Sequence, residues 1–391
     1  MVDQYHHGIR LVEVSNGARS LVTVATAIIG MVCTGPNADA ATFPLNRPVI
    51  ITDIDAAIGK AGITGTLASA MRAIGDQVRT PVVVVRVEDH ATPATLISNV
   101  IGTTLPNGQK TGLQALTAAQ AQLGVTPRIL GCPGLDAPAV TAALVVIAKK
   151  LRAMAYAAAV GADIAAAVTY RGTFGARELM LLYPDFIAFD TGANANVTSF
   201  AVARALGLRA RIDQEQGFHK TLSNVPVEGV VGLSRDIHFD IQDAGNEAGL
   251  LNASQITACI RSDTGFRFWG SRTCSDDPLF AFESATRTAQ VLADTIGRGL
   301  MWAIDKPLKP SLVKDIVETI NAEFRKLQSS GVIMGGKSWF DADRNPATQL
   351  QGGKLALDYE YTPVPPLEQL GLTQRITDTY LADFGSLVAA A

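Results

Sequence analysis

The sequence has little charge and few side chains that usually carry chemistry. Asp, Glu, Lys and Arg make up 18% of the 391 residues, against about 25% in an average globular domain. The 33 basic and 36 acidic residues leave a net charge of −3, which argues against nonspecific nucleic-acid binding. Low charge with 48% hydrophobic residues excludes a disordered chain and suggests that other protein covers much of the surface.

Cysteine and histidine are too scattered to nominate a site. The four cysteines show no C-x-x-C and no zinc-ligand spacing, which is typical of buried free thiols in a reducing compartment: Cys33, Cys132, Cys259 and Cys274. Neither H-E-x-x-H nor G-x-S-x-G occurs. The sequence therefore predicts no metal, no cofactor and no catalytic residue.

Long uncharged apolar runs are also missing. The alanine-rich stretch 137–169 carries Lys149, Lys150 and Arg152 in its middle, whereas a membrane span needs about 20 largely uncharged residues. The start, MVDQYHHGIR, is too polar for a secretory signal. We expect a soluble chain with no membrane insertion.

What is present is an alternation of apolar strand patterns with helical patterns up to about residue 213. This order predicts parallel β-α-β units, and therefore an α/β region. The predicted strands are 48–52, 81–87, 127–131, 155–160 and 178–183, and the predicted helices start near 53 and span 67–78, 137–154 and 197–212.

After about residue 213 this alternation ends, and the sequence predicts an α+β chain overall. A hairpin is predicted from 256–260 and 266–269, followed by a long helix beginning at Asp277 and a second helix at 311–328. Alternating side chains predict a strand over 354–361, and the proline-rich segment 362–366 a stiff linker. Beyond it, 372–384 is β-capable, and 8–14 is a lone strand that must pair with something.

Two motifs resemble catalytic or nucleotide sites. Residues 331–338 satisfy the phosphate-loop pattern G-x-x-x-x-G-K-[ST], but a predicted helix precedes them and 339–346 ends in a proline, so we interpret 331–336 as a glycine-rich turn. The weaker glycine run 59–65 more simply separates two short helices. Asp276 and Asp277 resemble a carboxylate pair, yet helix capping before Pro278 explains them.

The segment 266–273, with the letters FRFWGSRT, resembles the W-G-x-R-T signature of contractile tail sheath proteins. The likeness covers nearly the whole chain. The sheath proteins that it resembles include those of temperate contractile-tailed bacteriophages and of tail-like bacteriocins. It rests on these further segments: 5–8, 205–210, 213–217, 219–224, 277–278, 302–307, 345–346, 353–355 and 361–368.

The resemblance implies a non-enzymatic structural subunit of a virion tail, assembled in the host bacterial cytoplasm. Such subunits stack as six-membered rings around an inner tail tube and contract by rigid-body rearrangement. Baseplate and tail terminator proteins would be further partners. The family also implies a subtilisin-like fold in the middle region, without protease activity.

The resemblance further implies roles for the chain ends. Arms at both ends would complete β-sheets in neighbouring subunits. The N-terminal arm would use Ile9, Leu11, Val12 and Val14, and the C-terminal arm Arg375, Ile376, Tyr380 and Leu381. The candidates for facing the tube, which could equally be an ordinary solvated helix face, are Lys306, Lys309, Lys314, Arg325 and Lys326.

We expect four regions: an N-terminal arm at 1–24, an outer α/β region at 25–250 with a further division considered near 90, an inner sheath domain at 251–370, and a C-terminal arm at 371–391. A tail-like bacteriocin or injection device remains an alternative to a phage tail. A metabolic α/β enzyme with a ligand at the strand ends is a more distant one.

Overall fold

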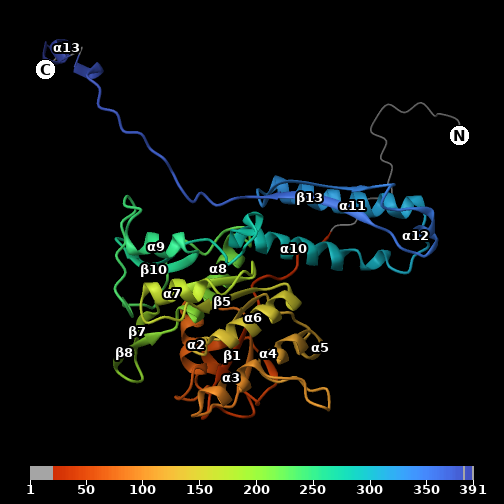
Figure 1. Ribbon diagram of the computed structural model, residues 1–391, viewed down its shortest axis with the longest axis horizontal. Helices are drawn as coiled ribbons and strands as arrows, with labels where there is room; N and C mark the ends of the chain where they lie inside the picture. The colour runs from red at the N-terminus through yellow and green to blue at the C-terminus, as the bar shows by residue number, and fades with distance from the viewer. Residues whose placement is uncertain (1–20, 382–383, 390–391) are drawn as a thin grey trace, which may run out of the picture.

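A computed structural model describes residues 21–381 and 384–389 of the chain (Figure 1). Its body is built on one eight-stranded sheet with the order β11-β10-β6-β5-β4-β1-β3-β2. The six inner strands, from β10 to β3, run parallel, while β2 and β11 pair antiparallel at the two edges. The strands are β1 (Ile29–Thr34), β2 (Pro48–Ile51), β3 (Val82–Val87), β4 (Ile129–Gly131), β5 (Met154–Ala158), β6 (Leu179–Tyr183), β10 (Ile256–Ser262) and β11 (Gly265–Trp269).

Helices cover both faces of this sheet, which explains why its central strands are apolar throughout. On one face α2 (Leu67–Gly75) and α8 (Ala201–Glu215) pack in one core cluster. On the other face α6 (Pro138–Leu151) packs in a second. The predicted α/β region is confirmed. The shorter helices are α1 (Ile54–Ile58), α3 (Pro93–Ile101), α4 (Gly112–Ala115), α5 (Ala119–Leu123), α7 (Ile164–Arg171) and α9 (Glu247–Ala253).

A small three-stranded sheet lies at the edge of the body, with the order β8-β7-β9. Its strands are β7 (Phe186–Asp190), β8 (Ala195–Ser199) and β9 (Gly232–Leu233). The predicted helix over 197–212 is wrong at its start, because 197–199 pair with β7 in this sheet. The helix begins at Ala201, whose backbone N–H donates to the Asp185 carboxylate at 2.7 Å.

The C-terminal part of the chain forms an elongated helix-and-hairpin unit beside the body (Figure 1). A small core joins α10 and α11 to the strand β12, with Leu292, Ile296, Ile320, Phe324 and Ile333 among its buried members. Its elements are α10 (Glu283–Gly299), α11 (Pro310–Ser329), β12 (Ile333–Phe340), α12 (Ala347–Gln351) and β13 (Leu357–Pro363).

Two predicted boundaries in this region are wrong. The long helix does not begin at Asp277: that carboxylate caps a short 3-10 helix, Pro278–Phe280, by accepting from the Leu279 N–H at 2.9 Å, and α10 begins six residues later at Glu283. The capping interpretation of Asp277 itself is confirmed. The glycine-rich turn is confined to Gly331, with φ of +73°, because Ile333–Phe340 form a strand antiparallel to β13.

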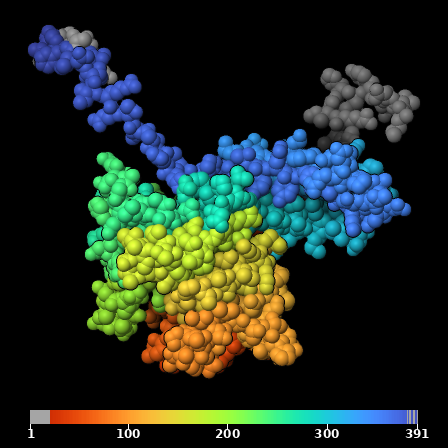
Figure 2. Space-filling view, viewed as in Figure 1, coloured from red at the N-terminus to blue at the C-terminus, as the bar shows by residue number. Residues whose placement is uncertain are grey.

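The predicted β-capable segment 372–384 forms no strand in the residues that the structure describes. It has no secondary structure up to residue 378, and then the 3-10 turn Thr379–Leu381 and the helix α13 (Phe384–Ala389). A strand needs a partner strand for its backbone hydrogen bonds. The segment runs away from the body, where the single chain offers none (Figure 2).

Candidate functional site

The body and the C-terminal unit meet at a buried network of charged side chains, which we call the junction network: Tyr156, Arg209, Asp213, Glu283 and Arg287. The Arg209 guanidinium on α8 donates to Asp213 Oδ1 at 2.7 and 3.0 Å and to Glu283 Oε1 at 3.2 Å. Arg287 on α10 donates to the other oxygen of Asp213, and the Tyr156 hydroxyl donates to Glu283. The Arg209, Asp213 and Glu283 side chains are fully buried.

The charges of this network depend on one another. Burial by itself would raise the pKa of Glu283, but the adjacent Arg209 and Arg287 guanidinium groups lower it overall. Burial, together with the Glu283 charge, raises the pKa of Tyr156. Buried charges of opposite sign are stable only when each keeps its partners. The network therefore ties α8 of the body to the first turns of α10.

A second buried carboxylate strengthens the same junction. Asp294, further along α10, pairs with Arg128 and Arg152 of the body. Burial lowers the pKa of Arg128 to about 10, against the opposing attraction of Asp294. Two successive stretches of α10 are thus held to the body by ion pairs, and its far end extends beyond the body (Figure 1).

The W-G-x-R-T segment lies where the body sheet ends and the C-terminal unit begins. Gly270 has φ of +131°, and a Cβ there would lie 2.4 Å from the Asn252 side-chain oxygen, so only glycine fits. Thr273 donates from its hydroxyl to the Phe280 carbonyl at 2.9 Å. Between them, Arg272 donates to both carboxylate oxygens of Glu368, at 2.7 and 2.6 Å.

The hairpin β12–β13 offers two open strand edges. Within the described part of the chain, neither strand has a partner on its outer side. One face packs on α11, where the Phe324 and Tyr359 ring centroids lie 6.0 Å apart. A Cβ on Gly336 would come within 2.9 Å of the Phe324 ring, so this second glycine of the phosphate-loop pattern serves close packing. Two-stranded sheets with free edges are marginal alone and readily accept further strands.

The C-terminal segment beyond Glu368 carries several exposed apolar side chains. Ile376 is 98% exposed and Leu381 is 67% exposed, and Arg375 is exposed as well. Tyr380 lies in the 3-10 turn. Exposed leucine and isoleucine in such a run are typical of a surface that another protein covers. The predicted N-terminal arm residues, Ile9, Leu11, Val12 and Val14, lie outside the described residues.

The five candidate tube-facing cations divide into two groups. Arg325 and Lys326 pair with Glu318 and Glu323 of their own helix. Lys306, Lys309 and Lys314 instead gather around the start of α11, whose first turn carries no acidic residue. Lys306 lies over the Trp302 ring, at 4.5 Å from its centroid. A positive helix end adds to the potential of these lysines.

Enzyme-like features lack the geometry of a site. The phosphate-loop pattern lies on a strand that follows a helix, and Lys337 stands opposite Glu360 in the hairpin. All four cysteines are buried, and burial raises the pKa of the Cys33 and Cys274 thiols to about 12. In residues 21–381 and 384–389, no three metal-ligating side chains come together, and no helix is both long and apolar enough to span a bilayer.

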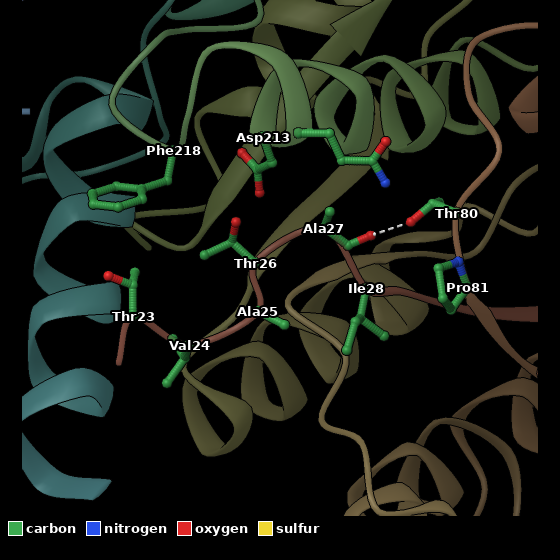
Figure 3. Close-up of a pocket in the computed structure, with 11 residues that line it drawn as sticks. Thr23, Val24, Ala25, Thr26, Ala27, Ile28, Thr80, Pro81, Asp213 and Phe218 are labelled. Atoms are coloured by element: carbon green, nitrogen blue, oxygen red, sulfur yellow. Dashed lines mark hydrogen bonds between the residues drawn. The ribbon is translucent and has the colours of Figure 1, made fainter. Parts of the chain in front are cut away.

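A hollow of about 500 Å³ is bordered by the segment 23–28, Thr80, Pro81, Asp213 and Phe218 (Figure 3). The Thr80 hydroxyl donates to the Ala27 carbonyl across its edge, at 2.9 Å. Its walls are mostly apolar, and Asp213 is already engaged by Arg209 and Arg287. The hollow is thus a gap between the segment 23–28 and the body. Among the described residues that line it, no nucleophile and base are in contact.

Comparison with known proteins agrees with this arrangement. Residues 26–87 match the tail sheath protein Gp18 domain III N-terminal region, 108–274 the phage tail sheath protein central domain, and 275–377 the phage tail sheath C-terminal domain. The tail sheath protein of Escherichia phage P2 is 54% identical over 98% of both chains. The major tail sheath protein of Serratia phage KSP20 is 45% identical over the full length of both.

Solved structures of similar fold come from the sheath and the baseplate of contractile injection particles. The sheath complex of an extracellular contractile injection system, PVC, in the contracted state has a TM-score of 0.71 at 16% identity, covering 97% of this chain and 100% of that one. A chain of the six-fold symmetrised anti-feeding prophage baseplate has a TM-score of 0.71 at 18% identity, covering 95% and 98%. This chain belongs to the phage tail sheath family and is a structural protein of a contractile tail, not an enzyme.

Proposed function

We propose that this chain polymerises as stacked six-membered rings around an inner tail tube, and that its subunits are joined by exchanged arms. The observation that carries this proposal is that one chain has both a C-terminal segment with exposed apolar side chains and a two-stranded sheet with two open edges. One edge of β12–β13 would accept the C-terminal arm of a neighbour, and the other edge an N-terminal arm. Head-to-tail contacts of this kind extend into a filament.

Ile376 and Leu381 fit this role by their exposure, and the other arm residues by their sequence pattern. Ile376 and Leu381, with Arg375 and Tyr380 beside them, would pair with a neighbour's hairpin, and Ile9, Leu11, Val12 and Val14 would do the same from the other end. Main-chain hydrogen bonds would supply affinity, and burial of isoleucine and leucine would add about 25 cal/mol for each Å² removed from water.

Contraction is proposed to need no nucleotide hydrolysis, because the phosphate-loop pattern lies on a strand of the hairpin. The free energy would be stored in a strained extended packing and released when subunit bodies repack against one another. The junction network supports movement of each subunit as one rigid body, since separating α10 from the body would expose or orphan several buried charges. Unchanged contacts between bodies after contraction would contradict this mechanism.

We further propose that the inner, tube-facing domain begins at 275 rather than near 251. Residue 250 lies inside α9, and the strands that follow, β10 and β11, belong to the body sheet. Of the five cations considered, Lys306, Lys309 and Lys314 are the best placed for an acidic tube surface. Arg325 and Lys326 are already paired within α11.

The relatives named as phage tail sheath proteins support the setting that we propose for the assembly. We propose a virion tail, assembled in the host cytoplasm, with baseplate and tail terminator proteins at its two ends and no contact with nucleic acid or insertion into membranes. A tail-like bacteriocin is the second candidate, because solved neighbours of similar fold come from injection systems.

Electron microscopy of negatively stained protein tests the proposal. Full-length protein is compared with a variant ending at Gly371, each with and without purified tube protein as a template. Hollow striated tubes from the full chain and only unassembled protein from the variant are expected. Tubes of normal striation from the variant would contradict polymerisation through the C-terminal arm.

A further inference from the structure

We propose that Arg272 and Glu368 form a clasp that fixes the direction in which the C-terminal arm leaves the subunit, so that Arg272 is a positioning residue for arm exchange. The consequence for assembly rests on the proposed function; the clasp itself is a property of the single chain. It gives the arginine of the W-G-x-R-T segment a role that the fold of the body alone does not explain.

The arginine side of the clasp is held firmly. Two residues before Arg272, Gly270 has a backbone conformation that only glycine can adopt. The residue after Arg272, Thr273, is buried and hydrogen-bonded to Phe280. The backbone of Arg272 forms an antiparallel bridge with Phe282. Its guanidinium lies over the Phe282 ring, at 5.3 Å from the centroid. The donor is therefore oriented before the arm arrives.

The arm side depends on a single acidic side chain. After β13 ends at Pro363, no backbone hydrogen bond is formed by residues 364–376 in the described structure, and Leu367, Leu370 and Leu372 are 79%, 67% and 85% exposed. Glu368 alone in this stretch is hydrogen-bonded to the body, through both carboxylate oxygens. The two planar groups match as a fork, which fixes orientation as well as distance.

Because the arm is long, a small change in its direction at Glu368 displaces its far end by a large distance. Eight residues separate Glu368 from Ile376, which is about 26 Å of strand at about 3.3 Å per residue. A swing of roughly 20° at the clasp would move Ile376 by about 9 Å. Neighbouring strands lie only about 4.8 Å apart, so such a swing would carry the arm past the hairpin edge of its partner.

Spin-label distance measurement tests the clasp in unassembled protein. Labels are attached at Lys354→Cys near the hairpin and Thr373→Cys on the arm, which is practicable because the four native thiols are buried. A narrow distance distribution is expected for the otherwise unchanged protein, and a broad one for Arg272→Gln and for Glu368→Gln. The exchanged pair R272E/E368R should recover the narrow distribution. Arg325→Gln, which breaks a more exposed ion pair with Glu318, is the control and should change nothing.

Assembly measurements separate this inference from the proposed function. Arg272→Gln and Glu368→Gln should each raise the protein concentration needed for tube formation by about two- to fivefold, as expected for an exposed but bidentate pair, and the exchanged pair should reverse the increase. If both single variants keep the narrow distribution, the clasp is refuted, whatever the tubes do. If the variant ending at Gly371 still forms tubes, arm exchange fails, while a broadened distribution would still establish the clasp.

Discussion

Replacing Glu283 by Gln should destabilise the whole subunit, because Glu283 is the acceptor at the centre of the junction network. Its two oxygens receive Arg209 at 3.2 Å, the Leu222 N–H at 2.9 Å, the Thr221 hydroxyl at 3.3 Å and the Tyr156 hydroxyl. Glutamine keeps the shape but offers one oxygen and turns an N–H₂ group toward donors. It also leaves the buried Arg209 and Arg287 with only Asp213 as a carboxylate partner.

Removing one partner of a buried ion pair costs about 3–5 kcal/mol. At roughly 2–3 °C per kcal/mol, the expected fall in Tm is about 6–15 °C. Differential scanning calorimetry measures it, with Glu318→Gln as control, because that residue belongs to an exposed pair worth about 0–1 kcal/mol. A Tm of E283Q within about 1 °C of the original would refute the reasoning that the network holds the junction.

The same network predicts a pH dependence of stability. The pKa of Glu283 is lowered in the folded state relative to its ordinary value of 4.5. The stabilisation that this carboxylate provides is therefore complete above pH 4.5 and is lost as the pH falls from there through the lowered pKa. The free energy of unfolding of E283Q should vary less over this acidic range than that of the original protein.

Three further predictions concern the surfaces and the signature segment. Ile376→Asp should prevent tube formation in electron micrographs, whereas Ile241→Asp, on an exposed loop of the body at 75% exposure, should leave it intact; equal loss in both would contradict a specific arm. Gly270→Ala should lower the free energy of unfolding by about 1–3 kcal/mol in urea titrations, whereas Gly297→Ala, which meets open space on α10, should be neutral or stabilising. Lys314→Glu should weaken co-sedimentation with tube protein severalfold at low salt, and unchanged binding would remove this lysine from the tube-facing set.

The junction gives a physical reason to regard the subunit as one mechanical unit. Forming a buried salt bridge costs free energy because both charges lose their water, but removing only one of the two partners costs more. Two such salt bridges, around Asp213 and Asp294, lie along one face of α10. Force applied to the hairpin would thus reach the body sheet through α10.

Local patterns in the sequence determined much of this protein. Apolar strands alternating with helices predicted the parallel sheet, because burial on both faces demands continuous apolar runs such as 82–85. Proline at 278 and the apolar stripe of 311–328 predicted the C-terminal helices, although with errors at the ends.

Tertiary structure decided what those side chains do. Glu283 reaches Arg209 across 74 positions of sequence, and Glu368 reaches Arg272 across 96, so no local period could reveal either pair. Residues 333–338 of the phosphate-loop pattern form a strand because β13 and Phe324 supply partners that a turn would have left unused. Residues 372–378 stay unpaired for the converse reason: sequence sets the capacity to form a strand, but only a neighbouring backbone can supply its hydrogen bonds.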